Sequence, residues 1–571
     1  MYKASDAFLE ALMEAEVSCV FANWGSDHPS ILETIAEARA DGRPTPRIVT
    51  CPNEMAGLSA AHGYYLMSGK AQAVIVHVEC GTQSLGGAVH NAAKGRIPVL
   101  IFAGASPYTQ NGEKRGSRNE FIQWIQDVHD QRGLVRGYTK YDNELRTGGN
   151  IKEIVHRAMQ FAASDPCGPV YLMAAREVLE EETTPSSSPR NHWKPLGPLP
   201  LPSGGVEAIA AALEGASRPL VVTSYAGRKT GAAEQLTRLC NRLGIGVLES
   251  VPICMNYPHQ DELYQGSQWN QQRQTPVLAQ ADVILVVDSD VPWIPTVNRP
   301  AENARIFHID VDPLKEQMPL WHIPAEQAFR ADAETALQQI NEYLEGRVTD
   351  EVRISERRAF YNALHRERRS ELEGLEAYPA GEAITSEYLV SCVRKRIDRD
   401  TIVLSESISE FHTVMNHLAM SRPGTIFSSG GGSLGWNGGA AVGAKLASPE
   451  KTVIAFTGDG SFMFSEPHAV HWMARRYNAP FLQIVLNNGG WKAPKLSALS
   501  LYPDTYVSKA ESLDIEFAPA PDYGSIAAAS GGAYARQVRR PEEVEGALDE
   551  ALKAVKTEGR SAVLDVFIPR G

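Results

Sequence analysis

Apolar and polar residues along this chain alternate in blocks that predict strands and helices in turn. Short apolar runs at 18–21, 73–76, 99–102 and 170–172 are typical of buried strands. Helical patterns begin at Ser5 and cover 55–67. An alternation of strands and helices favours a parallel sheet covered by helices. We therefore predict a parallel α/β domain in the first part of the chain.

The same pattern returns twice further along the chain. The second block has apolar runs at 220–222, 283–287 and 305–309. The third has them at 401–404, 452–456, 481–486 and 562–566. We predict an α/β protein with three successive doubly wound parallel-sheet domains, in which one architecture is used three times.

Two stretches interrupt this pattern and set the expected domain limits. Residues 184–204 are rich in proline and predict a linker, and residues 346–380 are densely charged and predict an exposed helical connection. The expected domains are 1–183, 205–345 and 381–571. A chain of 571 residues is too long for a single core, which agrees with three domains.

Composition narrows the possible partners. A net charge of −13 argues against nucleic acid, because phosphate backbones need a concentrated positive surface, so a small-molecule substrate is expected. The seven cysteines form no CxxC pair and suit a reducing compartment. No signal sequence and no run of about 18 apolar residues occurs. We expect a cytoplasmic protein that does not bind membranes.

Candidate chemistry lies at the ends of two predicted strands. Gly458-Asp459-Gly460 follows the run at 452–456, and Asn487-Asn488-Gly489-Gly490 follows the run at 481–486. The segment between them has the length of a crossover helix, so the strands should be parallel with a right-handed connection. Ligands bind at the carboxyl ends of such strands. Carboxylate, amide and carbonyl oxygens suit Mg²⁺, so the pair of motifs predicts a diphosphate–Mg²⁺ site.

A second motif offers a different interpretation. Residues 430–435 contain GxGxxG, and Asp459 lies where the ribose-binding acid of a Rossmann dinucleotide oxidoreductase would be. In a chain with 47 glycines this match is weak. The expected acid is not held between two glycines, and dinucleotide binding does not require the asparagine pair. This oxidoreductase remains the alternative from another class.

Taken together, these residues resemble the thiamine diphosphate-dependent enzymes of the decarboxylase and acetohydroxyacid synthase type, and the resemblance runs through the whole chain. It implies that the Asp459 carboxylate, the Asn488 side chain and the Gly490 carbonyl are Mg²⁺ ligands. It also implies that Leu434 lies beneath the cofactor and bends it into a V shape. The residues implied in cofactor binding are Glu54, Gly432, Leu434, Gly458, Asp459, Gly460, Ser461 and Asn488.

The resemblance requires a glutamate in the first domain, and Glu54 occupies its position. A carboxyl group bonded to N1′ of the aminopyrimidine favours the imino form that removes the thiazolium C2 proton. Burial against an apolar ring would raise the pKa of Glu54 and help it to keep or share that proton.

Locally the chain is most similar to the benzoylformate decarboxylases. Residues 20–26 and 77–84 place Ser26 and His77 on the active-site serine and histidine of that group. The group's second histidine has no counterpart in residues 289–295, and His28 could supply the missing imidazole. Catalytic candidates are therefore Glu54, His77, Ser26 and His28. Three tryptophans could line an apolar acyl pocket: Trp293, Trp436 and Trp491.

The resemblance implies a thiamine diphosphate- and Mg²⁺-dependent C–C bond lyase, decarboxylase or carboligase. It would act on a 2-oxo acid or a 2-hydroxy ketone through a C2 carbanion and an enamine. In this family the cofactor lies between two chains, so Glu54 and Asp459 of one site should come from different subunits. A homodimer is then the minimum, and a homotetramer is expected.

Alternatives within the same family remain open. Phe121 and Gln123 loosely match the Phe-Gln element of acetolactate synthase-like acyloin synthases, although they are one residue further apart. A 2-hydroxyacyl-CoA lyase would need a basic nucleotide pocket, for which only Arg228, Lys229 and Arg305 are available. No clear site for FAD is found. An intact Glu54 argues against a non-catalytic relative.

Overall fold

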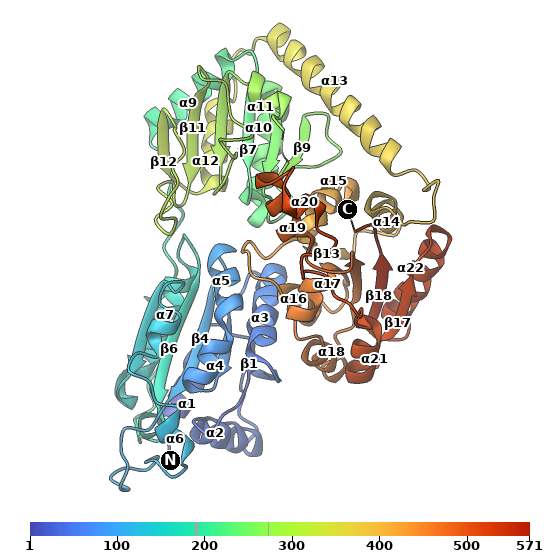
Figure 1. Ribbon diagram of the computed structural model, residues 1–571. Helices are drawn as coiled ribbons and strands as arrows, with labels where there is room; N and C mark the ends of the chain where they lie inside the picture. The colour runs from blue at the N-terminus through green and yellow to red at the C-terminus, as the bar shows by residue number, and fades with distance from the viewer. Residues whose placement is uncertain (189–191, 272, 571) are drawn as a thin grey trace. The chain divides into compact units, whose positions relative to one another are not determined.

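The computed structural model describes residues 1–188, 192–271 and 273–570 (Figure 1). These residues form three six-stranded sheets together with the helices that connect the strands. The chain divides into two compact units. Residues 1–196, 429–538 and 547–566 form the first, and the remaining residues, mainly 197–428, form the second. The expected three-domain α/β class is confirmed. The domain limits expected from the sequence stay a prediction.

The first sheet has the strand order β2-β1-β3-β4-β6-β5, and its strands pair in parallel. Its strands are β1 Cys19–Ala22, β2 Arg47–Thr50, β3 Gln72–Val76, β4 Val99–Ala105, β5 Tyr141–Leu145 and β6 Pro169–Ala175. The edge strands β2 and β5 were not expected, because both are only partly buried and mix polar with apolar residues. Each of them is held in the sheet by its pairing with a buried neighbour: β2 with β1, and β5 with β6.

The middle sheet has the order β12-β11-β10-β7-β8-β9. Its strands are β7 Pro219–Thr223, β8 Gly246–Ser250, β9 Tyr264–Gln268, β10 Val283–Val287, β11 Arg305–Asp310 and β12 Gln327–Arg330. In chain order this is the arrangement 3-2-1-4-5-6 read from the other edge, which is typical of dinucleotide-binding folds.

The third sheet has the order β14-β13-β15-β16-β18-β17. Its strands are β13 Thr401–Glu406, β14 Ile426–Phe427, β15 Thr452–Gly458, β16 Leu482–Asn487, β17 Tyr534–Val538 and β18 Ala562–Phe567. This repeats the order of the first sheet, whereas the middle sheet differs. All three sheets thus have the expected parallel α/β architecture, and only the strand order of the middle sheet differs, which apolar runs do not encode.

The connection between β15 and β16 is broken into two helices. α17 covers Asp459–Phe464 and α18 covers Pro467–Arg476. Glu466 between them has φ +54°, and Pro467 begins the second helix because proline has no N–H to donate there. β15 and β16 pair in parallel, as expected, with Gly458 opposite Leu486. The two motif-bearing strand ends therefore lie side by side.

One face of the first sheet is covered by helices α1 (Ala4–Glu14), α2 (Pro29–Ala40) and α7 (Ile151–Ala163). Phe8 of α1 packs against Phe102 of β4 with ring centroids 4.5 Å apart. Both rings are fully buried. Such a pair contributes about 0.5–1.5 kcal/mol beyond the burial of its area. This core fixes the strands whose carboxyl ends carry the candidate site.

α3 (Glu54–Ser68) and α16 (Trp436–Ala447) pack closely together within the first unit. A Cβ atom on Gly63 would lie 2.0 Å from the carbonyl oxygen of Ala440. One on Gly443 would lie 1.8 Å from that of Ala60. Two helix backbones can approach this closely only where side chains are absent. The glycines at these two positions therefore connect the Glu54 helix to the helix that follows the glycine-rich loop.

The charged segment at 346–380 is less exposed than expected. It forms the long helix α13 (Glu351–Leu375), which is drawn in yellow in Figure 1. Ile354, Arg357, Tyr361 and His365 are buried along one side of it. Their spacing of three to four residues gives a single stripe, which the many surrounding charges concealed in the sequence. α13 is thus partly buried against the middle domain.

Candidate active site

Asp459 stands at the carboxyl end of β15, as the first residue of α17. Its Oδ1 accepts a hydrogen bond from the Gly460 amide at 2.8 Å, and its Oδ2 accepts from the Gly489 and Gly490 amides at 2.8 and 2.9 Å. Burial raises its pKa, although these three amides favour the charged form. A buried carboxylate faced by backbone amides is a position that a bound cation would stabilise.

The second motif presents Asn488 and Gly490 beside this carboxylate. Asn487 ends β16 and its side chain donates to Asp565 Oδ1 at 2.8 Å, so it anchors the strand end. Asn488 follows at the turn. Gly490 has φ +150° and forms an isolated bridge with Glu516. The structure therefore brings the backbone that follows Asn488 against the Asp459 carboxylate, through the Gly489 and Gly490 amides.

Glu54 begins α3, just beyond the carboxyl end of β2. The preceding residue, Asn53, caps the helix by accepting from the Ala56 amide at 3.0 Å. Burial raises the pKa of Glu54, while a hydrogen bond with Asn23 partly opposes this. A Cβ atom on Gly81 would lie 3.1 Å from Glu54 Oε1, so that glycine leaves room for the carboxyl group. The arrangement holds a carboxylic acid that ionises reluctantly.

The loop that carries Leu434 is fastened to α5 (Gly86–Lys94). The fully buried Asn91 side chain donates to the Ser433 carbonyl at 2.8 Å and accepts from the Ser433 amide at 3.1 Å. His90 Nε2 accepts from the Gly432 amide at 3.0 Å. A Cβ atom on Gly435, which has φ +96°, would lie 2.6 Å from Met55 Cε. The Leu434 loop and the start of the Glu54 helix are thus neighbours in this chain.

His77 follows β3, at the position where the strand order of the first sheet reverses between β1 and β3. Its Nδ1 lies 2.5 Å from Asp27 Oδ1, and its Nε2 lies 3.0 Å from Gln126 Oε1. The hydrogen bond to Asp27 raises the pKa of His77. Sequence reasoning did not assign Asp27 or Gln126. Asp27 could have been found from the sequence, because it directly follows Ser26 after β1. No sequence motif marks Gln126.

His28 is fully buried, so it is not an exposed loop residue. Its Nδ1 accepts from the Gly25 amide at 3.1 Å, and its Nε2 lies 3.2 Å from Asp27 Oδ2. Burial lowers its pKa. Ser26 is half-buried beside it. His28 therefore stands behind Asp27, while a direct part for His28 or Ser26 in a reaction stays a prediction.

The three tryptophans differ in burial and surroundings. Trp293 and Trp436 are buried, the first in the core of the middle domain. Trp491 is 40% exposed and its indole lies against Gly460, where a Cβ atom would be 2.7 Å from Nε1. Trp491 thus adjoins the Asp459 motif.

The residues considered for the alternative enzymes are engaged elsewhere. Arg305 lies 2.8 Å from Glu326, and Lys229 lies 2.5 Å from Asp332. Arg228 lies 3.7 Å from Asp288. Gln123 is buried and accepts from the Asn119 amide at 2.8 Å, while Phe121 is exposed. The glutamine that reaches His77 is Gln126.

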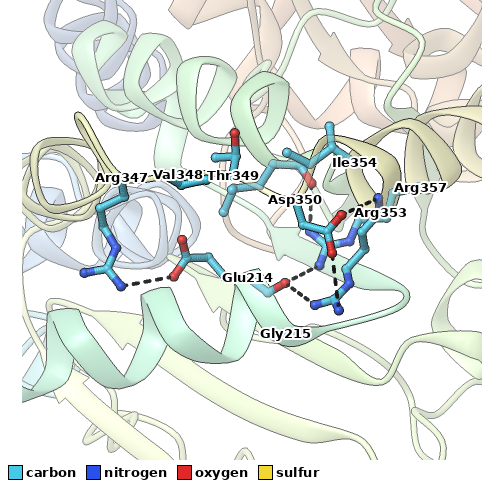
Figure 2. Close-up of a pocket in the computed structure, with 10 residues that line it drawn as sticks. Glu214, Gly215, Arg347, Val348, Thr349, Asp350, Arg353, Ile354 and Arg357 are labelled. Atoms are coloured by element: carbon cyan, nitrogen blue, oxygen red, sulfur yellow. Dashed lines mark hydrogen bonds and ion pairs between the residues drawn. The ribbon is translucent and has the colours of Figure 1, made fainter.

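A cavity of ≈ 370 Å³ lies on the middle domain, at the start of α13 (Figure 2). Its lining includes Arg347, Arg353 and Arg357. The buried Arg357 donates to the carbonyls of Leu213 and Leu243, near the ends of α9 (Ser203–Gly215) and α10 (Thr230–Leu243), at 2.9 and 2.8 Å. Arg357 thus satisfies helix-end carbonyls, which is a structural role.

Among the described residues, no helix combines the length and the apolar character needed to span a bilayer.

Three family models match the chain. The N-terminal thiamine pyrophosphate-binding domain matches residues 2–134, and the thiamine pyrophosphate enzyme central domain matches residues 206–340. The C-terminal thiamine pyrophosphate-binding domain matches residues 409–566. These regions contain Glu54, His77, Asp459 and Asn488.

Several related proteins align with most of this chain. A benzoylformate decarboxylase of Pseudomonas aeruginosa is 26% identical over 97% of both chains. A probable acetolactate synthase large subunit of Methanococcus aeolicus is 24% identical over 88% of this chain and 82% of the relative. The structure of the thiamine diphosphate-dependent 4-hydroxybenzoylformate decarboxylase of Rhodococcus jostii RHA1 is similar in fold, with a TM-score of 0.78, 22% identity and 99% coverage of both chains.

Proposed function

The chain belongs to the thiamine pyrophosphate enzyme family and is a thiamine diphosphate-dependent decarboxylase or carboligase, and we propose that it needs Mg²⁺ and acts on a 2-oxo acid. The observation that carries this proposal is the placement of Glu54 and Asp459. Each follows the carboxyl end of a parallel strand, and burial raises the pKa of both carboxyl groups. A 2-hydroxy ketone is the other substrate class to test.

Asp459, the Asn488 side chain and the Gly490 carbonyl would hold Mg²⁺ and, through it, a diphosphate. The donor set fits, because hard oxygen ligands from a carboxylate, an amide and a carbonyl match the preference of that ion. The three amides around Asp459 orient its carboxylate, leaving its remaining lone pairs for a cation. Leu434 would support the cofactor from its loop.

When bound, thiamine diphosphate supplies a carbon nucleophile and an electron sink for breaking the bond next to a carbonyl group. Glu54 would hold a proton at its carboxyl group, opposite the aminopyrimidine. His77 would give or take a proton at Nε2 near neutral pH. Ser26 and Asn23 are both half-buried and follow the carboxyl end of β1.

A carboligase related to the acetolactate synthases is the second candidate, since such a relative aligns over most of the chain. A 2-hydroxyacyl-CoA lyase has less support, because Arg228, Lys229 and Arg305 each face a carboxylate. Product analysis with pyruvate, benzoylformate, branched 2-oxo acids, 2-hydroxyacyl-CoA esters and benzoin separates these reactions.

We also propose a homodimer as the minimum active unit, with a homotetramer expected and a cytoplasmic location. α19 (Lys492–Leu501) and α20 (Tyr506–Lys509) follow the motif at 487–490, and none of their residues is buried. Leu501 and Tyr506 are 72% and 93% exposed. An apolar surface of this kind supports contact with a second copy. Analytical ultracentrifugation tests the assembly.

Circular dichroism during titration with thiamine diphosphate and Mg²⁺ tests the cofactor site. We expect a new near-ultraviolet band that EDTA removes. Asp459→Asn should weaken Mg²⁺-dependent binding at least about tenfold, since it removes a ligand charge. Asp504→Asn, at an exposed position in the same domain, should leave it unchanged.

Glu54→Gln should bind the cofactor but lower turnover by about 10²–10⁴-fold, because the amide has no acidic proton to exchange. Binding that does not depend on Mg²⁺, or full turnover by Glu54→Gln, would contradict the proposal.

A further inference from the structure

Four polar side chains contact one another in a row that includes His77. His28, Asp27, His77 and Gln126 come from three separate segments: the loop after β1, the end of β3, and the turn after α6 (Ile122–Ile125). Asp27 and His28 are buried, with 2% and 0% exposure, and Gln126 is 4% exposed. His77 is the most exposed member, at 23% of its side chain. The chain therefore leads from the core to an accessible imidazole.

Asp27 is placed to be an anion. Its Oδ2 accepts from the Val78 amide at 3.1 Å, and its Oδ1 faces His77 Nδ1 at 2.5 Å. A Cβ atom on Gly104 would lie 1.7 Å from Oδ2, so only glycine leaves room for this carboxylate. Although burial opposes ionisation, His28, His77 and the Val78 amide, whose N–H groups face the carboxylate, lower the pKa of Asp27 overall. The carboxylate thus needs a cation nearby.

Hydrogen-bond donors and acceptors identify which imidazole is the cation. His28 Nδ1 accepts from the Gly25 amide, so it carries no hydrogen, and the neutral ring has its hydrogen on Nε2, 3.2 Å from Asp27 Oδ2. His77 differs, because both of its nitrogens face oxygens: the Asp27 carboxylate and Gln126 Oε1. A ring that faces two acceptor oxygens can donate to both only in the imidazolium form.

Other ionisable groups nearby reinforce this assignment. Glu54 acts on His77 and raises its pKa further, while burial lowers the pKa of His28. Burial, together with the Asp27 carboxylate, raises the pKa of Tyr171 to about 12, so the phenol stays neutral. The charges facing His77 are therefore negative.

We propose that Asp27 is a positioning residue that keeps His77 protonated on both nitrogens, so that Nε2–H recognises an anionic oxygen of the substrate in the place now taken by Gln126 Oε1. The substrate group is then the carboxylate of a 2-oxo acid rather than the neutral oxygen of a 2-hydroxy ketone. This inference rests on the proposed function for its substrate, but the charge on His77 is a property of the protein alone.

Solid-state ¹⁵N spectra of histidine-labelled full-length protein measure that charge without cofactor or substrate. His77→Gln assigns the signal. We expect His77 to be doubly protonated at pH 7.5, and Asp27→Asn to lower its titration midpoint by at least one pH unit. Asp27→Glu should restore part of the shift. A neutral His77 in the wild type, or an unchanged midpoint in Asp27→Asn, would overturn the proposal.

A matched control exists in the same domain, where His156 Nε2 lies 2.9 Å from Glu14 Oε2. Glu14→Gln also removes a carboxylate from a buried histidine, but it should leave the His77 midpoint unchanged. Thermal melting shows whether Asp27→Asn is folded. If it is not, Gln126→Glu provides the test, because a carboxylate opposite Nε2 should raise the His77 midpoint. No rise would count against the assignment.

Competition binding to the holoenzyme tests the substrate class, using pyruvate and benzoylformate against their neutral amides. The wild type should prefer each acid at least tenfold, and Asp27→Asn should lose most of that preference. Equal affinity for acid and amide, or no binding of either, would overturn the anionic substrate group. Thiamine diphosphate binding is recorded for the same samples: if it fails while His77 is doubly protonated, the proposed function is wrong and the Asp27–His77 pair stands.

Discussion

Glu54 combines partial burial with a carboxyl group, and this combination has a measurable cost to stability. Burial raises its pKa in the folded chain above the value of an unfolded glutamate. In the window between those two values the folded state binds the proton more tightly, so stability falls as pH rises through it. Above the folded pKa the full penalty is present, and below about pH 4 it disappears.

Glu54→Gln should therefore stabilise the cofactor-free protein near neutral pH by an amount of the order of 1 kcal/mol, as is common when a strained functional group is removed. The gain should vanish as the pH approaches 4. Urea unfolding at several pH values measures it. Glu33→Gln, at an exposed position of α2, is the comparison, and a gain for Glu54→Gln that does not change with pH would contradict this explanation.

At the level of elements, the glycine-rich loop depends on a helix from the first domain. Asn91 pairs with both backbone groups of Ser433, in the manner of a strand neighbour. His90 adds a bond to Gly432. Leu434 follows Ser433 directly, so these hydrogen bonds also restrain its position. These hydrogen bonds from Asn91 and His90, here called the clamp, connect α5 to the loop that would support the cofactor.

Asn91→Leu should destabilise the protein by about 1–3 kcal/mol, because it leaves the Ser433 amide and carbonyl without partners. It should also weaken thiamine diphosphate binding, since the Leu434 loop loses its anchor. Urea midpoints and cofactor titration measure the two effects. Asn111→Ala, at an exposed position, should change neither. Normal cofactor affinity in a folded Asn91→Leu variant would contradict the clamp.

The contact between α3 and α16 predicts opposite effects for two similar substitutions. Gly443→Ala should cost about 1–3 kcal/mol, because its Cβ would collide with the Ala60 carbonyl and separate the helices. Gly546→Ala lies in α22 (Pro541–Lys556), where nothing approaches within 4 Å, and should stabilise by about 0.5–1 kcal/mol. Thermal unfolding of both variants is the measurement. Equal effects would show that the close approach does not matter.

For the whole molecule, the open question is which chains contribute to one site. The proposed homodimer would place Glu54 and Asp459 of one site on different subunits. In the single chain, Met55, next to Glu54, adjoins the loop at Gly435. The arrangement of the subunits decides whether Glu54 forms a site with Asp459 of its own chain or with Asp459 of a second copy.

Mixing Glu54→Gln with Asp459→Asn distinguishes the two arrangements. If sites form between subunits, half of the mixed dimers are heterodimers and one of their two sites is intact, so about a quarter of the activity should return. If each site belongs to one chain, every site keeps one defect and no activity returns. We expect recovery. Denaturation and refolding of the mixture, followed by an assay with the best 2-oxo acid, measures it.

The residues at strand ends were predictable, because buried apolar runs locate the strands and parallel pairing brings their carboxyl ends together. In this way Asp459 and Gly490 were expected to be neighbours, and their contact is found. The resemblance contributed Glu54 and His77. By contrast, β2 and β5 lack a continuous apolar run, and nothing in sequence marks Gln126 as a partner of His77.

The sequence by itself determined the α/β class, most central strands and the neighbouring positions of Asp459 and Gly490, since these follow from local periodicity and from motifs that are continuous in the chain. Only the tertiary structure decided the strand order of the middle sheet, the burial of α13, and the His28–Asp27–His77–Gln126 chain. These features depend on contacts between segments far apart in the chain. Local patterns fix an element and its buried face, but the partner of that face is chosen by the packing of the whole fold.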